Sequence, residues 1–325
     1  MNAKDLRIVF MGTPEFAVPS LRALADGGYN IVAVVTTPDK PAGRGRKLHE
    51  SDVKIAAREL GLPVLQPEKL KAPEFVEAMR ALQPDLGVVI AFRMLPEVIW
   101  RMPKLGTFNL HAALLPQYRG AAPINWAIIN GERETGLTTF LLNHEIDKGA
   151  IIDRLRMPIG EEDTVGTMYE KLMAAGVGLV LDTVDRIAAG SIAPTEQQFV
   201  DESTLRPAPK IFKEDCRIDW SWNGRRIIDF IRGLSPYPSA WSELRRDGHE
   251  PLNVKVFSAR FEPKPTDALP GTIRSDRRDT ISVACADGWI DLLDLQLAGK
   301  KRITTHDLLL GFREIEEYAF PSVRE

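Results

Sequence analysis

The first 190 residues alternate between short apolar runs and segments with helical periodicity, and this alternation restricts the possible folds more than any other feature. The apolar runs, each of strand length, are 7–12, 30–37, 85–92, 106–116 and 136–143. The helical segments that separate them are 13–28, 51–61, 72–83 and 123–130. Apolar strands separated by helices are typical of a parallel sheet covered on both faces. We therefore predict an α/β domain with a doubly wound, mainly parallel sheet.

The pattern changes in the second part of the chain. A long amphipathic segment at about 164–190 predicts a helix, and polar, Pro-containing sequence follows it. Beyond it lie short alternating segments with Asp-Gly turns at 247–248 and 287–288. Such a pattern favours a small antiparallel barrel or sandwich. The predicted organisation is a first domain at 1–190, a linker at 191–209 and a smaller β-barrel domain at 210–325.

Charge and cysteine content exclude several classes of protein. The 42 basic and 45 acidic residues give a net charge of -3, which argues against a generally basic nucleic-acid coat but allows a local basic patch. The two cysteines, Cys216 and Cys285, are far apart and lack CxxC spacing, so we predict neither a disulfide framework nor a metal site. The N-terminal segment has the pattern of neither a signal peptide nor a membrane span.

A polar pair interrupts the apolar run at 106–116. Asn109 and His111 are two residues apart, so in a strand their side chains lie on the same face. In a doubly wound sheet, sites lie at the carboxyl ends of the strands, where this pair is expected. Both side chains could donate hydrogen bonds to a carbonyl oxygen that becomes negatively charged. The alternative is a structural histidine, which is the more common role of a lone His on an apolar run.

Asp147 follows the next predicted strand, 36 residues after His111. A carboxylate at the same sheet edge could orient the histidine or accept a proton. The alternative is a turn-forming Asp, because Lys and Gly come directly after it. Asn109, His111 and Asp147 together would suit acyl transfer without a covalent nucleophile.

A Gly/Pro-rich loop at 36–54 carries four closely spaced cations: Lys40, Arg44, Arg46 and Lys47. Flexible cationic side chains on such a loop can contact phosphates. The alternative is an ordinary solvated run of charge. The strand-to-helix turn at 11–14 lacks the GxGxxG pattern, so the sequence does not support a dinucleotide site.

Extended motifs along nearly the whole chain resemble those of the folate-dependent formyltransferases. They include "RIVFMGTPEFAVPSL", "GTFNLHAALLPQYRGAAPINWAIINGERETG", "IDKGAII" and "IRGLSPYPSAW". The Asn-x-His…Asp trio is specific to this superfamily. "PAGRGRKL" and "LQLAGKKR" are similar to the member that acts on tRNA.

This resemblance implies a Rossmann-like catalytic domain followed by an OB-like domain that binds tRNA. It implies transfer of the formyl group of 10-formyltetrahydrofolate to the α-amino group of methionine on initiator tRNA, in support of translation initiation. Asn109 and His111 would stabilise the tetrahedral intermediate, and Asp147 would assist proton transfer. The implied partners are initiator methionyl-tRNA and the folate, without a metal or a membrane. The chain would be a monomer in a bacterial cytoplasm or an organellar matrix.

The resemblance also implies two sets of binding residues. The folate would contact Phe92, Arg93, Met94, Leu95, Leu114, Pro116, Asn143 and Glu145. The tRNA would contact Lys40, Arg44, Arg46, Lys47, Lys300, Lys301 and Arg302.

The chain departs from the family pattern at two places. Ala113 stands where the family usually has Ser, and Asn143, Glu145 and Lys148 replace residues of its usual Asp-x-Gly-x-Asp-Thr-Gly motif. Three other functions remain open from the residues. They are formyl transfer to a sugar or ribonucleotide amine, tRNA binding without catalysis, and nucleotide-dependent dehydrogenation.

Overall fold

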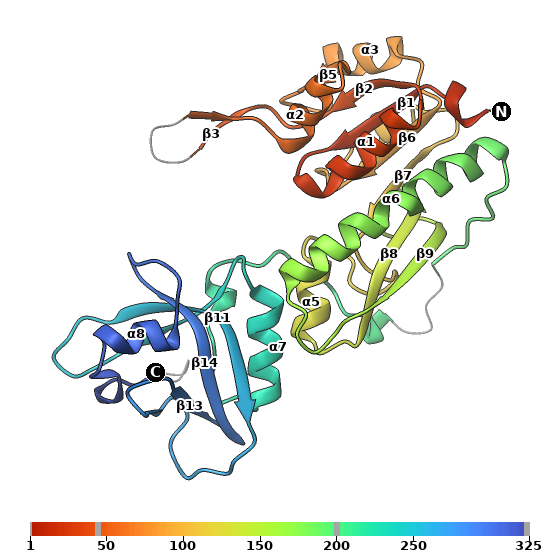
Figure 1. Ribbon diagram of the computed structural model, residues 1–325. Helices are drawn as coiled ribbons and strands as arrows, with labels where there is room; N and C mark the ends of the chain where they lie inside the picture. The colour runs from red at the N-terminus through yellow and green to blue at the C-terminus, as the bar shows by residue number, and fades with distance from the viewer. Residues whose placement is uncertain (1, 43–46, 198–201, 322–325) are drawn as a thin grey trace. The chain divides into compact units, whose positions relative to one another are not determined.

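The structure, a computed structural model, describes residues 2–42, 47–197 and 202–321 (Figure 1). The side chains at positions 41, 42, 47 and 202 lie outside this description. The chain divides into two compact units, and each is built from several segments of sequence. The first unit comprises Met1–Gly120, Thr135–Met157 and Tyr169–Pro207. The second unit comprises Ala121–Glu134, Pro158–Met168 and Ala208–Glu325. The predicted boundaries at 190 and 209 remain predictions.

A seven-stranded sheet with the order β5-β2-β1-β6-β7-β8-β9 forms the centre of the first unit. Its strands are β1 Ile8–Gly12, β2 Ile31–Val35, β5 Val64–Leu65, β6 Leu86–Ile90, β7 Thr107–His111, β8 Glu134–Leu141 and β9 Ile151–Pro158. The pairs from β5 to β7 are parallel, and β8 pairs antiparallel to β7. The predicted doubly wound, mainly parallel sheet is therefore confirmed. Every residue of β1 and β6 is buried, which explains their uninterrupted apolar sequences.

Helices cover both faces of this sheet. They are α1 Val18–Asp26, α2 Asp52–Glu59, α3 Pro73–Ala81, α4 Glu97–Trp100 and α6 Val165–Ala189. One face presents Val9, Met11 and Val89 to a core cluster that includes residues of α3 and α4. On the opposite face Leu110 contacts α6, where an added Cβ at Gly176 would lie only 3.0 Å from the Leu110 side chain. The glycine therefore permits close approach of helix and sheet.

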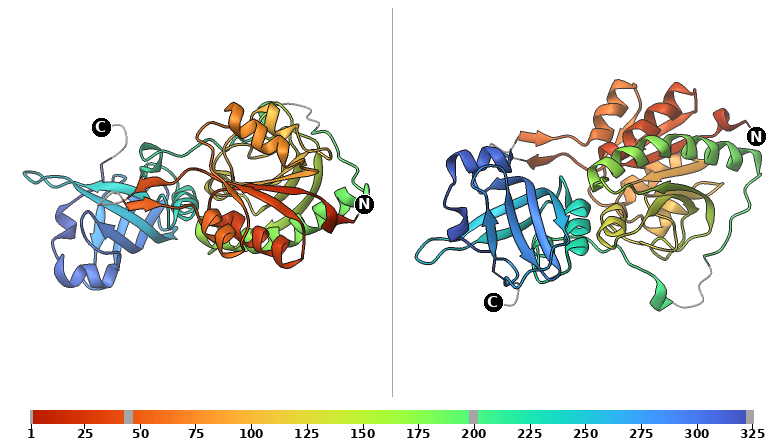
Figure 2. Two further views of the ribbon diagram at one scale, coloured as in Figure 1. Left: turned by 90° about the horizontal axis from the view of Figure 1, so that it is seen from above. Right: turned by 60° about the horizontal axis from the view of Figure 1, so that its bottom comes forward.

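Residues of the predicted basic loop form a two-stranded ribbon instead of an irregular loop. β3 Lys40–Ala42 and β4 Lys47–His49 pair antiparallel, with Lys40 opposite His49. Both views of Figure 2 show this ribbon extending away from the seven-stranded sheet. The segment after α6, predicted as a linker, makes specific contacts with the first unit. Its Thr195 pairs with Ile151 of β9, and the carbonyl of Arg206 accepts from the Tyr118 N–H.

The second unit contains an antiparallel sheet with the order β10-β11-β14-β13-β12, and β15 pairs with β14. Its strands are β10 Ala240–Leu244, β11 Leu252–Glu262, β12 Ile273–Ser275, β13 Ile281–Cys285, β14 Gly288–Leu297 and β15 Ile303–Thr304. Ala319 bridges to Arg245 after β10 and to Thr272 before β12, so one segment joins the two ends of the sheet order. The predicted second, antiparallel β domain is confirmed. Its core surrounds the fully buried Trp220.

Three helices accompany this sheet: α5 Pro123–Ile129, α7 Gly224–Leu234 and α8 Thr305–Gly311. Helix α7 was not predicted from the sequence, and it begins at the N-cap Asn223, whose side chain accepts from the Arg226 N–H. α5 packs on α7 with Gly233 at the contact, where the Asn125 side chain donates to the Gly233 carbonyl at 2.8 Å.

Candidate active site

His111 is the last residue of β7 and is buried, with 7% of its surface exposed. Its Nε2 lies 2.8 Å from the carbonyl oxygen of Tyr118. A carbonyl can only accept, so Nε2 carries a hydrogen and donates it. Nδ1 is then the ring nitrogen that remains available for a ligand or a proton, and it lies 3.9 Å from Asp147 Oδ2. In a neutral ring Nδ1 can accept a hydrogen bond, and in a protonated ring it can donate one.

Asp147 lies in the loop between β8 and β9 with a φ of 54°, a left-handed conformation that Asp adopts more readily than most residues. Its Oδ2 accepts the Gly120 backbone N–H at 3.0 Å, and 14% of its side chain is exposed. The end of the loop can approach β8 this closely only because residue 149 is Gly. A Cβ there would overlap the Leu141 carbonyl oxygen. The turn and the functional interpretations of Asp147-Lys-Gly are thus compatible.

Asn109 lies two residues before His111 on the same face of β7, beside Val89 of β6 and Phe140 of β8. Its buried Oδ1 has no hydrogen-bond partner among the residues that the structure describes. Leaving a buried polar group unpaired costs about 1–3 kcal/mol. Such a cost in a polar side chain two residues before a histidine, on the same strand face, is typical of a group that binds a ligand.

Two further buried polar atoms share this edge of the sheet. Thr13 Oγ1 follows β1 and Arg93 Nε follows β6, and within the described chain neither has a hydrogen-bond partner. β1, β6 and β7 are neighbours in the sheet, so the unpaired atoms of Thr13 and Arg93 follow two strands that lie beside the strand of Asn109. This concentration makes the carboxyl edge the candidate ligand site, where sites of open parallel sheets are expected. Thr13 was not among the predicted site residues.

The predicted folate residues after β6 differ in their surroundings. Met94 is 75% exposed, whereas Leu95 belongs to the core cluster of the sheet. The Arg93 guanidinium donates to the carbonyls of Glu68 and Pro67 and lies over the Phe92 ring, 5.7 Å from its centroid. Burial lowers the pKa of the Arg93 guanidinium. Folate contacts by these residues stay a prediction.

The positions that depart from the family pattern have local structural partners. Ala113 is fully buried, and its carbonyl accepts the Thr138 hydroxyl at 2.6 Å. In the Asp147 loop, Asn143 Oδ1 accepts the Glu145 N–H at 2.9 Å, and Glu145 pairs with Lys148 at 2.9 Å. Lys148 holds the pKa of the Glu145 carboxyl below its ordinary value. The remaining two predicted folate residues, Leu114 and Pro116, are half-buried in the segment after β7.

The base of the β3–β4 ribbon is tied to the body of the first unit by Lys54 of α2. Lys54 Nζ lies 2.6 Å from Asp39, directly before β3, and 3.0 Å from Glu50, directly after β4. Gln66 also donates to Asp39 at 2.8 Å. The hydrogen bonds from Lys54 and Gln66 hold the pKa of the Asp39 carboxyl below its ordinary value. Both legs of the ribbon are therefore anchored by one amine.

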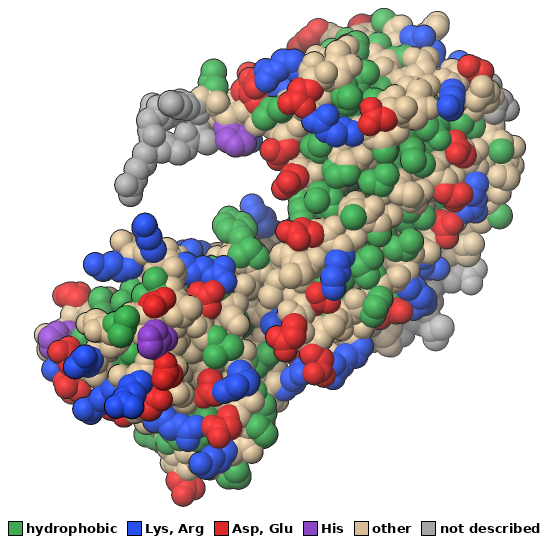
Figure 3. Space-filling view, viewed as in Figure 1, with side chains coloured by type: hydrophobic (Ala, Val, Ile, Leu, Met, Phe, Trp, Pro, Cys, Tyr) green, Lys and Arg blue, Asp and Glu red, His purple; other side chains and the backbone are tan. Residues whose placement is uncertain are grey.

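The predicted tRNA residues are described only in part. Lys40 is exposed at the start of β3, and Lys47 begins β4, while Arg44 and Arg46 lie outside the described residues. Lys300, Lys301 and Arg302 are exposed in the turn between β14 and β15. Arg302 pairs with Asp294 and lies 4.3 Å from the centroid of the Phe257 ring. On the face drawn in Figure 3, Lys and Arg side chains of the second unit are mixed with Asp and Glu.

Sequence reasoning missed the backbone groups that hold the site together. The Tyr118 carbonyl and the Gly120 N–H are main-chain atoms, and any residue type can supply them. The signal available was the Tyr-Arg-Gly segment that follows the histidine strand.

Across the described residues, no group of three or more His, Cys, Asp or Glu side chains could hold a metal ion. The same part of the chain contains no helix with the length and apolar character needed to cross a membrane.

Comparisons with known proteins extend over nearly the whole chain. A family model described as Formyl transferase matches residues 6–184, and one described as Formyl transferase, C-terminal domain, matches residues 210–313. The Methionyl-tRNA formyltransferase of Bacteroides fragilis is 55% identical over 325 residues, covering 99% of this chain and 100% of the relative. That of Parabacteroides distasonis is 56% identical over 321 residues, covering 98% and 99%.

A solved structure shows a similar fold at low identity. It is the sugar 3N-formyl transferase WlaRD in the presence of dTDP and 5-N-formyl-THF, with a TM-score of 0.63 and 18% identity. The match covers 91% of this chain and 99% of WlaRD.

Proposed function

The chain belongs to the formyl transferase family, and from this premise we propose that it formylates the α-amino group of methionine on initiator tRNA, with 10-formyltetrahydrofolate as the donor. Curated relatives named for methionyl-tRNA formylation, with 55–56% identity over nearly the full chain, support this substrate. The observation that carries the chemistry is the placement of His111 and Asp147 close together, with Asn109 and its unpaired amide oxygen on the same strand as His111. The three groups supply donors and a proton acceptor around one carbonyl.

The reaction moves one formyl group between two nitrogens. The neutral amine attacks the formyl carbon, which forms a C–N bond and places negative charge on the formyl oxygen. The C–N10 bond of the folate then breaks, the attacking nitrogen loses a proton and N10 gains one. Hydrogen-bond donors held in place before the reaction stabilise such an oxyanion.

The side chains divide these tasks. The amide N–H groups of Asn109 donate to the oxyanion, and Nδ1 of His111 also donates to it when that nitrogen carries a proton. The Asp147 carboxylate, 3.9 Å from Nδ1, stabilises the ring in that form and assists removal of the amine proton. The Tyr118 carbonyl occupies Nε2, so His111 acts through Nδ1.

The assay that tests this function compares two tRNAs. Formyl transfer from 10-formyltetrahydrofolate is measured with charged initiator methionyl-tRNA and, beside it, elongator methionyl-tRNA. We expect transfer to the initiator and little to the elongator. Absence of transfer to both would reject the proposed substrate and leave a small amine as the acceptor.

Replacing Asn109 by Ala should lower kcat about 100-fold, the usual loss when one oxyanion donor is removed. Stability should be unchanged or higher, because the variant loses a buried oxygen that has no partner in the described chain. Single-turnover formyl transfer and thermal unfolding measure the two effects. A parallel loss of activity and stability would instead indicate a structural role for this amide.

Replacing Lys54 by Met should raise the KM for tRNA about 10-fold, because a less anchored ribbon must be ordered on binding. The kcat and the KM for the folate should stay unchanged. Lys54→Arg, which keeps both ion pairs, is the matched control. An equal rise of KM for both substrates would contradict a role restricted to the ribbon.

We further propose a cytoplasmic location, in a bacterium or an organellar matrix, and a monomeric state. Light scattering coupled to size exclusion tests the latter. A dimer at micromolar concentration would reject it.

A further inference from the structure

We infer that Gln197, in the segment predicted as a linker, is a positioning residue that holds Asp147 against His111. This inference rests on the proposed function for the role of Asp147, and on contacts within the first unit for the role of Gln197. Helix α6 ends at Ala189, and Gln197 lies in the segment that follows it, 50 residues after Asp147. It has no place in the chemistry described above.

The side-chain amide of Gln197 grips the Asp147 loop at two points. Its Nε2 donates to the carbonyl of Asp147 at 2.8 Å and to the carbonyl of Gly149 at 2.8 Å. These carbonyls belong to the peptide groups that follow Asp147 and Gly149. One NH2 group therefore fixes the backbone at Asp147 itself and two residues later.

The loop needs such a clamp because its conformation is unfavourable by itself. Asp147 has a positive φ, which costs a residue with a Cβ about 1–2 kcal/mol. The loop between β8 and β9 has no regular secondary structure, and Ile146 is 63% exposed. The hydrogen bonds from Gln197 therefore add a restraint to the one that the Gly120 N–H provides at Asp147.

The amide oxygen of Gln197 contacts the segment 118–120, whose Tyr118 carbonyl binds His111. Gln197 Oε1 accepts from the Arg119 guanidinium at 2.8 Å. The residues on either side of Arg119 hold the proposed catalytic groups: the Tyr118 carbonyl accepts from His111, and the Gly120 N–H donates to Asp147. Three consecutive residues thus connect His111, Asp147 and Gln197.

The orientation of the amide is determined by its partners. Carbonyls only accept and a guanidinium only donates, so Nε2 must face the Asp147 loop and Oε1 must face Arg119. The backbone before Gln197 is also held, because Thr195 and Ile151 exchange two hydrogen bonds of 2.8 Å. The clamp therefore lies two residues after an isolated antiparallel bridge that fixes the backbone of this segment to β9.

Gln197→Glu separates the two halves of this clamp. It keeps the size of the side chain and an oxygen acceptor for Arg119, but it places a carboxylate oxygen against two carbonyl oxygens. We expect kcat to fall at least about 10-fold, since small displacements of a catalytic group cost this much or more. The KM values for tRNA and folate should change less than about twofold, as expected for an effect on the chemical step alone. Gln197→Met, which lacks both polar groups, should behave in the same way.

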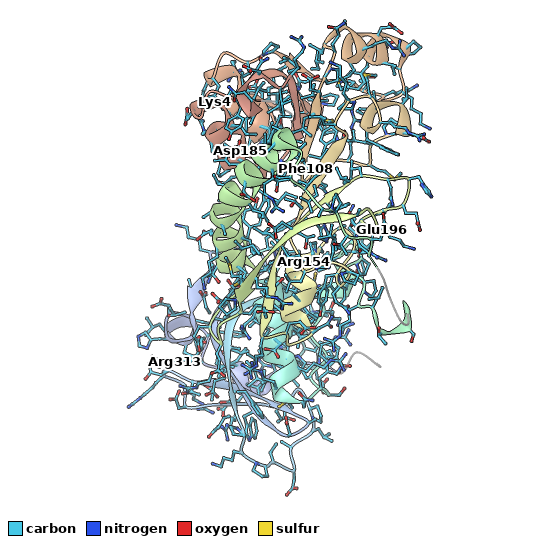
Figure 4. The ribbon with its side chains drawn as sticks, turned by 90° about the vertical axis from the view of Figure 1, so that its right-hand side faces the viewer. Lys4, Phe108, Arg154, Asp185, Glu196 and Arg313 are labelled. Atoms are coloured by element: carbon cyan, nitrogen blue, oxygen red, sulfur yellow. The ribbon has the colours of Figure 1, made fainter. Side chains whose placement is uncertain are left out.

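The neighbouring residue provides the matched control. Glu196, labelled in Figure 4, is exposed on the same segment, and Glu196→Gln is the reverse chemical change one position earlier. It should leave kcat unchanged. A similar loss in both variants would overturn the assignment to Gln197.

A double-mutant cycle distinguishes positioning from a general structural role. If Gln197 acts through Asp147, Gln197→Glu should have almost no further effect on kcat in an Asp147→Asn background. The same fold-loss in both backgrounds would overturn the inference.

Hydrogen exchange tests the clamp independently of catalysis. Amides of residues 143–150 should exchange at least about 10-fold faster in Gln197→Glu, because the loop opens more often. Unchanged exchange would overturn the clamp. A wild-type chain that does not formylate methionyl-tRNA would reject the proposed function, while the exchange result would still decide the role of Gln197.

Discussion

Replacing Asp147 by Asn is expected to lower kcat about 10²–10⁴-fold, the range for loss of a group that transfers protons. Asn adopts the left-handed conformation as readily as Asp, so the φ of 54° is retained. In the wild-type protein the Gly120 N–H donates to the Asp147 carboxylate at 3.0 Å, and the amide oxygen of Asn can accept the same hydrogen bond. The substitution therefore removes the negative charge facing His111 and little else.

The measurement is single-turnover formyl transfer at saturating folate and tRNA. Asp153→Asn is a suitable control, because Asp153 is on β9 and forms a partly exposed ion pair with Arg186. Such pairs contribute about 0–1 kcal/mol and have no role in the proposed chemistry. If the kcat of Asp147→Asn stays within a factor of about three of the wild-type value, Asp147 does not take part in proton transfer.

Replacing His111 by Ala should also cost at least about 100-fold in kcat, and up to about 10⁴-fold if the ring both donates to the oxyanion and moves a proton. The ring is buried and its Nδ1 lies 3.9 Å from Asp147, so bulk water cannot easily take over its role in the variant. The KM for either substrate should change far less, because the effect is on the transition state.

His111→Gln separates chemistry from packing. Glutamine fills much of the same volume and can donate to the Tyr118 carbonyl as Nε2 does, but it cannot take up a proton near neutral pH. We expect it to unfold at nearly the wild-type temperature and to remain as inactive as the Ala variant. Recovery of near-normal turnover in His111→Gln would show that the histidine is structural.

The parts of the fold that the sequence predicted are those with strong local patterns. β1 and β6 are uninterrupted apolar runs, and α2, predicted at 51–61, begins after the N-cap Ser51, whose side chain accepts from the Lys54 N–H. β9 was missed because it lies at the edge of the sheet and, after Ile152, alternates half-buried residues with exposed ones such as Arg154 and Arg156, which weakens its apolar pattern. The β3–β4 ribbon was missed because Pro and Gly dominate the local sequence.

For the site, the sequence by itself determined which residue types are present and that Asn109 and His111 share one face of a strand. The two-residue period of a strand is local, so spacing alone is sufficient for that conclusion. Only the tertiary structure decided that Asp147 reaches His111, that Nε2 is occupied by Tyr118, and that Gln197 holds the loop. The longest of these contacts joins residues 50 positions apart, from Asp147 to Gln197. Such contacts depend on the order of the strands in the sheet and on backbone groups that every residue carries. A pattern of side chains along the sequence specifies neither.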